Sequence, residues 1–465
     1  MTARESDVNP FLQGNFAPWR LEGTADDLEV TGAIPRELNG TFYRNGPNPA
    51  YEPVGRYHWF DGDGMIHAVT LRDGRAAYRN RWVQSDGLKE ERAAGEALYP
   101  GLLELKPTEQ PRFKVTANTN IVCHAGRLLA LVEAALPTEL SRESLATVGL
   151  YDFNGKLSGP MTAHPKLDPQ TGEMLFFGYS PFPPYLQYHV VDRGGALVRS
   201  EVIDVEWPSM IHDFAITADY VVFILCPLVF SFENLAATGR LFSWEPQRGT
   251  RIGVMPRSGG NADVRWFETD ASYVFHPMNA YAENGSVTLD VARYNALRFM
   301  SPDAARDPSI GDDQAARLHR WRIDLSPGGG ITSTPLDDVS CEFPRVDERL
   351  VGLKHRFGYV AAVGDEDTGG KPLWTTIKKY DLQRGTSEQR RFGAGNGVGE
   401  PLFVPRHDAA EEDDGFVLAL VYDHTRNASD FYVLDARNIS GEPLATVHIP
   451  NRVPYGFHGN WVPSA

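Results

Sequence analysis

The sequence has little cysteine and little positive charge. Its three cysteines lie far apart among apolar residues, at Cys123, Cys226 and Cys341. Cysteines that are odd in number and dispersed do not form a disulfide framework, so we expect free thiols in a reducing cytoplasm. The formal net charge is −16, and no run of five basic residues occurs. Nucleic-acid-binding proteins carry clustered Lys and Arg, so we expect no nucleic-acid partner.

Long apolar segments are also missing. Residues 1–19 contain no apolar stretch of the kind found in secretory signals, and no segment approaches the roughly 18 apolar residues of a membrane-spanning helix. The longest apolar runs, residues 219–232 and 415–423, have the length of buried strands. We therefore expect a cytoplasmic protein that does not span a membrane and needs no obligate protein partner.

The patterns that are present favour β-strands. Short β-branched or aromatic runs, bounded by Gly, Pro, Asn or Asp, recur from about residue 30 to the C-terminus. The pair Asn284–Gly285 joins two such runs and predicts a hairpin, and residues 416–436 predict a second hairpin with a longer loop. Helical patterns are confined to residues 90–98 and part of 312–324. No linker divides the chain, so we predict one all-β domain over residues 1–465, with a closed or radially repeated sheet that protects its edges.

Several common catalytic motifs are absent from the chain. It contains no H-E-x-x-H, C-x-x-C, G-x-S-x-G or Walker sequence, and the glycine-rich residues 393–400 do not match a dinucleotide-binding loop. No histidine is followed two residues later by Asp or Glu, so the short signature of a 2-His-1-carboxylate iron site is missing as well. The remaining candidates for chemistry are the 13 histidines.

Four of these histidines share an unusual context. Each lies among apolar or aromatic residues, close to Pro or Gly, at the edge of a strand-like run: His164, His212, His276 and His458. A buried imidazole needs a polar partner, and metal ligation is one way to supply it. Taken alone, each is more typical of a hydrogen-bonded core histidine. Four of the kind, in a chain with no other catalytic motif, favour a metal site.

Three glutamates have a similar context. Glu133 ends an apolar strand, Glu342 lies in S-C-E-F-P, and Glu400 precedes P-L-F-V-P. A carboxylate in such a run is costly to bury unless it is hydrogen-bonded or paired. One interpretation is a carboxylate at a sheet edge that reaches solvent. The other is a carboxylate that accepts the second ring N–H of a metal-bound imidazole and so fixes the ring orientation.

Eight segments, in order, resemble landmarks of the carotenoid cleavage oxygenase family: GTFYRNGPNP, WFDGDGMIHAV, AHPKLDPQTGE, IHDFAIT, VFHPMNAYAENG, EFPRV, EPLFVPR and FHGNW. The resemblance covers almost the whole chain, from about residue 15 to residue 463. The resemblance implies a seven-bladed β-propeller capped by a dome, with one Fe(II) on the propeller axis. It implies that His164, His212, His276 and His458 bind the iron and that Glu133, Glu342 and Glu400 support them. Thr119 matches a position near dioxygen in some relatives.

The resemblance also implies the reaction. Dioxygen is added across a conjugated C=C bond, which breaks to give two carbonyl products, without reductant or organic cofactor. Three glutamates would approximately balance the charge of Fe(II), which four neutral imidazoles leave uncompensated. Four ligands on a metal that accepts six leave positions open, whereas a four-ligand zinc site would be closed. A non-catalytic propeller that only binds a partner is the alternative, and loss of any of the four histidines would favour it.

The substrate class is harder to predict. Relatives that cleave phenolic stilbenes or phenylpropenoids carry a lysine before the first glutamate and an upstream tyrosine, which together grip the phenol oxygen. Here Val132 precedes Glu133, although Tyr99 could replace the tyrosine. An apolar wall suits a polyene better than a phenolate, so we predict a carotenoid or apocarotenoid as the substrate. The alternative is cleavage of a lignostilbene, isoeugenol or vinylguaiacol type of alkene to aromatic aldehydes.

An apolar substrate that partitions into membranes would require peripheral contact with a bilayer. The candidate segment is residues 226–235, in which Leu228, Val229, Phe230 and Phe232 follow Pro227. The alternative is a buried strand that continues past its proline.

Overall fold

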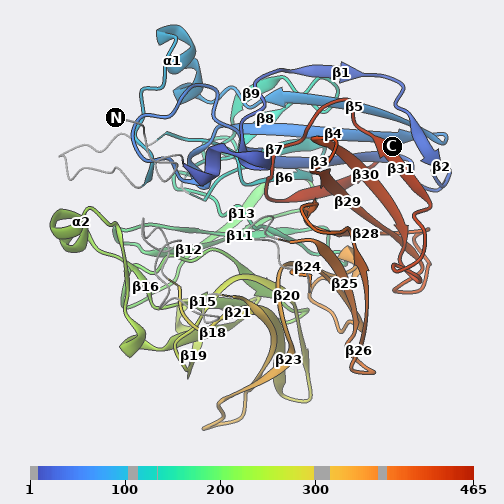
Figure 1. Cartoon of the computed structure of the whole chain (residues 1–465). Coiled ribbons are helices and arrows are strands. Elements are labelled where there is room, and N and C mark those ends of the chain that lie inside the picture. The colour runs from blue at the N-terminus through green and yellow to red at the C-terminus, as the bar shows by residue number, and fades with distance from the viewer. Residues whose placement is uncertain (1–8, 103–113, 134, 298–314, 365–373, 465) are drawn as a thin grey trace.

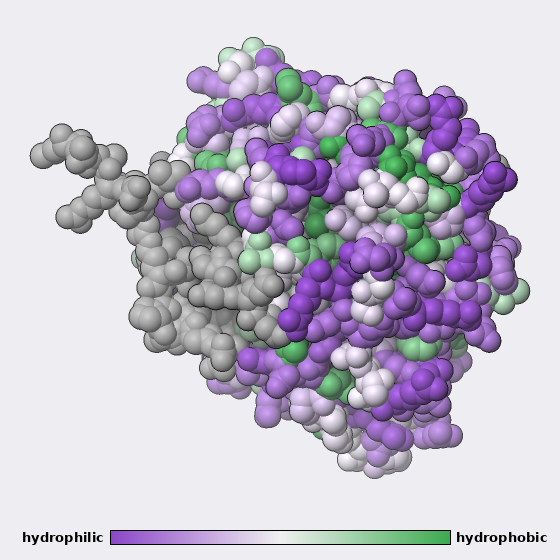
Figure 2. Space-filling model, turned by 45° about the vertical axis from the view of Figure 1, so that its right-hand side comes forward, coloured by the Kyte–Doolittle hydropathy of each residue, from purple (hydrophilic) through white to green (hydrophobic). Residues whose placement is uncertain are grey.

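The structure is a computed structural model that describes residues 9–102, 114–133, 135–297, 315–364 and 374–464. Antiparallel sheets follow one another around a common centre, with the N-terminal and C-terminal sheets side by side (Figure 1). These sheets form seven blades, so the propeller that the family resemblance implies is confirmed. The surface seen in Figure 2 is largely hydrophilic, with hydrophobic side chains in small groups, as a net charge of −16 leads one to expect.

The first four blades are built from the N-terminal part of the chain, except for one C-terminal strand. The first has five strands, β1 (Gly23–Ala25), β3 (Gly40–Pro47), β4 (Gly64–Arg72), β5 (Arg75–Trp82) and the C-terminal β32 (Gly459–Pro463). The second blade has four strands, β6 (Asn120–His124), β7 (Arg127–Leu131), β8 (Thr138–Leu140) and β9 (Thr147–Leu150). The third has β10 (Lys166–Leu167), β11 (Met174–Tyr179), β12 (Leu186–Val191) and β13 (Leu197–Val202). The fourth has β14 (Phe214–Ile216), β15 (Tyr220–Leu225), β18 (Thr250–Pro256) and β19 (Arg265–Thr269).

The fifth and sixth blades share one long strand. Their seven-stranded sheet contains β20 (Tyr273–Glu283), β21 (Ser286–Tyr294), β22 (Arg317–Asp324), β23 (Ile331–Arg345), β24 (Phe357–Ala362), β25 (Thr376–Asp381) and β26 (Thr386–Arg391). The strand β23 pairs with β22 up to Ser340 and with β24 from Cys341 onward, so it leaves one blade and enters the next.

The seventh blade closes the ring with strands from both ends of the chain. It contains β27 (Gly397–Val398), β28 (Leu402–Pro405), β29 (Gly415–Asp423), β30 (Ala428–Asp435) and β31 (Ala445–His448), and it gains the N-terminal β2 (Val30–Gly32). In exchange, β32 joins β3 in the first blade. Phe42 of the first blade packs against Phe416 and Phe431 of the last, so apolar side chains fill the space between the blades. This exchange removes the open edges that an unclosed sheet would expose.

Two α-helices and a small hairpin lie outside the blades in the described part of the chain. The helix α1 (Asp86–Ala94) begins at Ser85, whose Oγ accepts the Leu88 N–H, and ends at Gly95, whose φ of 78° suits glycine. The hairpin β16 (Leu228–Phe230) and β17 (Phe242–Trp244) encloses α2 (Phe232–Thr238). Short 3₁₀ turns are η2 (Pro10–Leu12), η3 (Gly14–Phe16), η4 (Trp59–Asp61), η6 (Pro246–Arg248), η7 (Asn261–Asp263) and η9 (Glu348–Leu350).

The local predictions have mixed outcomes. Asn284 and Gly285 both have positive φ and connect β20 to β21, so the first hairpin is confirmed, as is the hairpin of β29 and β30. The helix predicted within residues 312–324 is wrong for residues 317–324, which form β22, while residues 312–314 lie outside the described part. Pairing with both neighbouring strands outweighs the weak helical pattern there.

The segment predicted to contact a membrane is mostly buried, so that prediction is wrong for two of its residues. Leu228 and Val229 are 2% and 5% exposed, because β16 pairs with β17 and Leu228 packs into the core. Phe232 is exposed. None of the helices in the described part of the chain has the length and apolarity needed to cross a bilayer. The three cysteines are free, and burial raises the pKa of Cys226 to about 12.

Candidate metal centre

Four different blades bring the four predicted histidines to one point. His164 and His212 lie in the segments that lead into β10 and β14, His276 lies within β20, and His458 immediately precedes β32. One ring nitrogen from each lies within 4.8 Å of the others, and all four residues are buried. The Nε2 atoms of His164 and His212 are 3.0 Å apart, and those of His212 and His276 are 3.1 Å apart.

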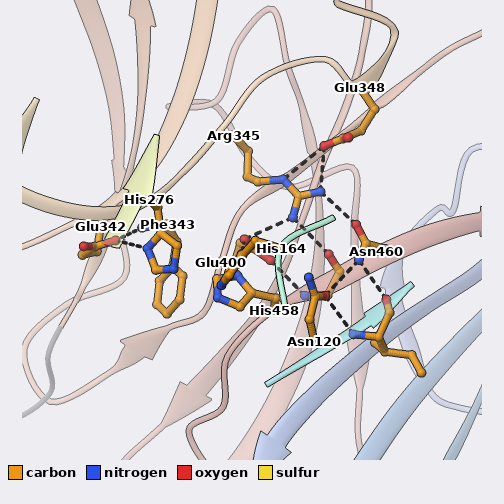
Figure 3. Close-up of polar contacts among 12 residues, drawn as sticks. Asn120, His164, His276, Glu342, Phe343, Arg345, Glu348, Glu400, His458 and Asn460 are labelled. Carbon is orange, nitrogen blue, oxygen red and sulfur yellow. Dashed lines mark hydrogen bonds and ion pairs between the residues drawn. The ribbon is translucent and has the colours of Figure 1, made fainter. Parts of the chain in front are cut away.

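Each of the three predicted glutamates lies behind one of the four rings. Nδ1 of His276 is 2.5 Å from Oε2 of Glu342, and Nδ1 of His458 is 2.9 Å from Oε1 of Glu400 (Figure 3). Nδ1 of His212 contacts Oε1 of Glu133 in the same way. Because an ionised carboxylate can only accept, it places the ring proton on Nδ1 and leaves the lone pair on Nε2.

Each glutamate is also held through other contacts. Tyr179 donates its hydroxyl to Oε2 of Glu133 at 2.6 Å, and Tyr294 donates to Oε1 of Glu342 at 2.8 Å. The backbone N–H of Gly459 donates to Oε2 of Glu400 at 2.9 Å. The carboxylates therefore have fixed orientations, and the imidazoles they hold are fixed in turn.

The fourth ring has a different environment. Nδ1 of His164 is 3.8 Å from Oδ2 of Asp213, which is too long for a hydrogen bond. Lys166 donates to Asp213, with its Nζ 2.7 Å from Oδ1 and 3.0 Å from Oδ2. Asp213 directly follows His212 in the chain, and Lys166 lies two residues after His164, so the two histidine segments supply this ion pair.

These residues fit a metal ion. Lone pairs on neighbouring Nε2 atoms that are about 3 Å apart repel one another unless a cation lies between them. Two nitrogens that are each about 2.1 Å from one ion are about 3.0 Å apart when they subtend a right angle, and about 3.4 Å apart in a tetrahedron. The separations of 3.0 and 3.1 Å lie in the range of two nitrogens that bind one metal ion.

The protonation states suit a metal as well. Burial, followed by the neighbouring imidazoles, lowers the pKa of His164 well below its usual value. Burial alone would raise the pKa of Glu400, but Arg345 and then His458 lower it to about 2. Burial would also raise the pKa of Glu342, but His276 outweighs it and the pKa is lowered. For His164, Glu342 and Glu400 these are the states that metal binding requires, a neutral imidazole and ionised carboxylates. Burial would also lower the pKa of His212, but Glu133 outweighs it and the pKa is raised.

A cavity of about 1440 Å³ opens in front of this cluster. His212, His276 and His458 line it, together with many aromatic side chains, among them Trp59, Phe60, Phe275, Phe343, Trp374 and Phe457. Such a lining excludes water and accepts a flat apolar molecule.

Thr119 lies at the wall of the cavity beside His458. Its carbonyl oxygen accepts the His458 N–H at 3.1 Å, and its hydroxyl donates to Oδ1 of Asn118 at 3.0 Å. Thr119 therefore lines the cavity next to one of the four histidines, while a position near dioxygen stays a prediction.

A lysine that the sequence patterns did not reveal lies in the same wall. Lys114 and Tyr99 both line the cavity and both pack around Gly87. The Lys114 ammonium is 2.5 Å from Oδ1 of Asp63 and also contacts Glu91. Val132, next to Glu133, is apolar wall, as predicted. The positive charge near Tyr99 is thus already neutralised by two carboxylates.

The fold and the site define a propeller with a buried four-histidine metal centre. The family profile described as retinal pigment epithelial membrane protein (RPE65) matches residues 16–463. A carotenoid cleavage oxygenase of Mycobacterium tuberculosis is 40% identical over 508 residues, covering 98% of both chains. An isoeugenol monooxygenase of Pseudomonas nitroreducens is 35% identical over 480 residues, covering 99% of both chains.

Solved structures agree with these sequence matches. The lignostilbene dioxygenase of Pseudomonas brassicacearum has a TM-score of 0.92 at 35% identity, covering 98% of this chain and 99% of its own. The chain belongs to the carotenoid cleavage oxygenase (RPE65) family. It is a non-haem iron dioxygenase that cleaves an alkene. All four histidines are present, so nothing supports the alternative of a non-catalytic propeller.

Proposed function

We propose that His164, His212, His276 and His458 bind one Fe(II) per chain, supported by Glu133, Glu342 and Glu400. The meeting of four buried imidazole nitrogens within 4.8 Å carries this proposal. Bound iron would supply the activation of dioxygen that alkene cleavage needs. We also propose that residues 1–465 form one domain, since β2 and β32 exchange between the first and last blades.

We infer that the substrate is a carotenoid or apocarotenoid. A cavity of about 1440 Å³ exceeds the roughly 300–1,000 Å³ of common small-molecule sites and has room for a long polyene. Its aromatic side chains would hold the polyene flat and keep water out, while Val132 offers it an apolar contact next to Glu133. His212, His276 and His458 at the cavity wall would place one double bond beside the metal.

Cleavage of a phenolic stilbene or phenylpropenoid is the second candidate. The placement of Tyr99 beside Lys114 in the cavity wall favours it, as do the names of two relatives, isoeugenol monooxygenase and lignostilbene dioxygenase. Against it, Asp63 and Glu91 already neutralise the Lys114 charge, so a phenolate would have to displace a carboxylate.

The substrate test begins with anaerobic reconstitution of the full chain with Fe(II). Dioxygen is then added with a panel of apocarotenals and hydroxystilbenes, and the products are identified by mass spectrometry. We expect the parent to cleave apocarotenals. Val132→Lys places an unpaired charge in the apolar wall and should lower kcat/KM for them at least about tenfold, while Val132→Leu should not. A parent that ignores every polyene but cleaves a phenolic alkene would establish the second candidate instead.

We propose that peripheral membrane contact is made by Phe182 and Phe232 rather than by Leu228. Phe182 is 61% and Phe232 43% exposed, their rings stack 5.2 Å apart, and both line the cavity. Exposed aromatic rings at a cavity entrance suit contact with a lipid surface.

The membrane proposal is tested with Phe182→Ser/Phe232→Ser. This variant should bind phosphatidylcholine liposomes several-fold more weakly and cleave a membrane-dispersed apocarotenoid more slowly, with little change on a short water-soluble alkene. The matched control is Val148→Ser/Val198→Ser, which removes two other apolar side chains that are at least as exposed on average, at 67% and 57%. Equal losses on both substrates would show that the two rings only shape the cavity.

A further inference from the structure

The strand β23 supports two of the four histidines at once. Glu342 on this strand accepts from His276, while Arg345, three residues later, contacts Glu400 behind His458 (Figure 3). Between them the pairing with β24 is irregular, and Phe343 has a φ of 53°, which is rare for a residue with a Cβ. The Phe343 ring centroid lies 5.6 Å from the His276 ring and 5.3 Å from the His458 ring.

The Arg345 side chain is 14% exposed and its guanidinium is fully engaged. Nη1 is 3.1 Å from Oε1 of Glu400 and 3.2 Å from the Gly459 carbonyl oxygen. Nη2 is 2.7 Å from Oε1 of Glu348 and 3.0 Å from Oδ1 of Asn460. One rigid fork therefore fixes both the carboxylate behind His458 and the backbone that follows His458.

The same network reaches the backbone beside His164. Asn460 donates to Oδ1 of Asn120 at 3.1 Å, and Asn120 donates to the carbonyl oxygen of Ala163 at 2.8 Å. Figure 3 shows these contacts as one continuous chain from Arg345 to Asn120. Hydrogen bonds thus connect Arg345 to the segments that carry His458 and His164, and Arg345 shares β23 with Glu342, the partner of His276.

Charge gives Arg345 a second role. When ionised, the three glutamates behind the imidazoles carry one more negative charge than a divalent metal carries positive charge. Lys166 and Asp213 neutralise each other. Glu348 also contacts Arg345, but it is half exposed, so solvent screens its charge. The buried Arg345 guanidinium supplies the missing positive charge, which matters because an uncompensated buried charge is costly.

We propose that Arg345 is a positioning residue for the metal centre, acting through Glu400 on His458 and completing the buried charge balance. This inference goes beyond the proposed substrate and rests on the proposed four-histidine metal site. Nothing in it requires Arg345 to touch the substrate.

The test is a Co(II) titration of the full-length, metal-free chain, followed by the visible spectrum of bound Co(II). Arg345→Met should lower Co(II) affinity about 10- to 100-fold, as removal of an outer partner of a metal ligand does, and should shift the Co(II) bands. The matched control is Arg349→Met. Arg349 lies four residues after Arg345, and its guanidinium pairs with Asp347 instead of Glu400. This variant should leave both readouts unchanged.

A double-variant cycle separates this role from a structural one. In the Glu400→Gln background, Arg345→Met should cost less than about threefold in affinity, because the group through which it acts is already changed. Equal losses in both backgrounds, or a parental spectrum for Arg345→Met, would overturn the proposal. Should the Met variant not fold, Arg345→Gln keeps hydrogen-bond donors without charge and repeats the comparison. A parent that binds no Co(II) would refute the metal site itself.

Discussion

Three of the four histidines at the centre of the propeller have a glutamate directly behind the ring, whereas His164 faces an aspartate that a lysine holds away. The carboxylate contacts of His276 and His458 are 2.5 and 2.9 Å long, and His212 has a similar one. The corresponding distance for His164 is 3.8 Å. The difference separates two ways to orient an imidazole.

The glutamate-backed rings are oriented and polarised through their Nδ1–H groups. The His164 ring is oriented mainly through its backbone. The backbone N–H of His164 donates to Oγ1 of Thr162 at 3.1 Å, and the following Pro165 restricts His164 to an extended conformation. Lys166 then takes both oxygens of Asp213. His164 should therefore be the least basic of the four imidazoles toward a metal.

Removal of an imidazole should have the largest effect on this centre. His276→Ala leaves three nitrogens and an uncompensated Glu342, so we expect metal content to fall from about one ion per chain to below about 0.1. Metal analysis after reconstitution measures this. Chelation should also lower the Tm of the parent, because metal binds the folded state, but not that of His276→Ala.

His67→Asn is the matched control for that experiment. His67 is also buried, but its Nδ1 meets the hydroxyl of Tyr78 at 2.7 Å, outside the cluster. It should retain about one ion per chain. If His276→Ala still binds one ion per chain, His276 is not a ligand.

Removal of the charge behind an imidazole should have the next largest effect. Glu342→Gln keeps the side-chain volume but weakens the acceptor for His276, so we expect metal affinity to fall about 10- to 100-fold without unfolding. Glu133→Gln and Glu400→Gln should behave alike. Titration with Co(II) and circular dichroism measure the two quantities. Glu139→Gln, which loses only a pair with Arg127, is the control. Parental affinity in all three variants would contradict the role of the glutamates.

The predictions from sequence succeed where a pattern is local. The four histidines and three glutamates each stand out in their own segment, because burial of an imidazole or a carboxylate requires a partner. Strand patterns and the Asn284–Gly285 turn predict an all-β fold, because they too depend only on residues that are close in the sequence. The seven-bladed ring and the iron required the resemblance to a family, since blade number depends on contacts between distant segments.

The charged residues that contact these glutamates and histidines could not be predicted from local patterns. Arg345, Asp213 and Lys166 are charged residues next to apolar runs, which is typical of solvated positions, and only the folded ring brings them to the centre. Their positions within E-F-P-R-V, I-H-D-F and A-H-P-K are the one signal available. The prediction that Leu228 and Val229 are exposed was wrong for a related reason. Their strand β16 pairs with β17, and this pairing cannot be seen from the proline that precedes them.

The smallest effect on the metal is expected from Asp213→Asn, which tests the comparison most directly. Because Asp213 does not hydrogen-bond to His164, its charge should contribute little to the ligand, and we expect Co(II) affinity to change less than about threefold. Stability should fall by up to about 3 kcal/mol, since Lys166 loses a buried partner. Asp168→Asn breaks a similar pair with Arg257, which also joins the third and fourth blades, and should cost similar stability at unchanged affinity. If Asp213→Asn lowered affinity as strongly as Glu342→Gln, the aspartate would act as a fourth supporting carboxylate, and the two sides of the centre would not differ.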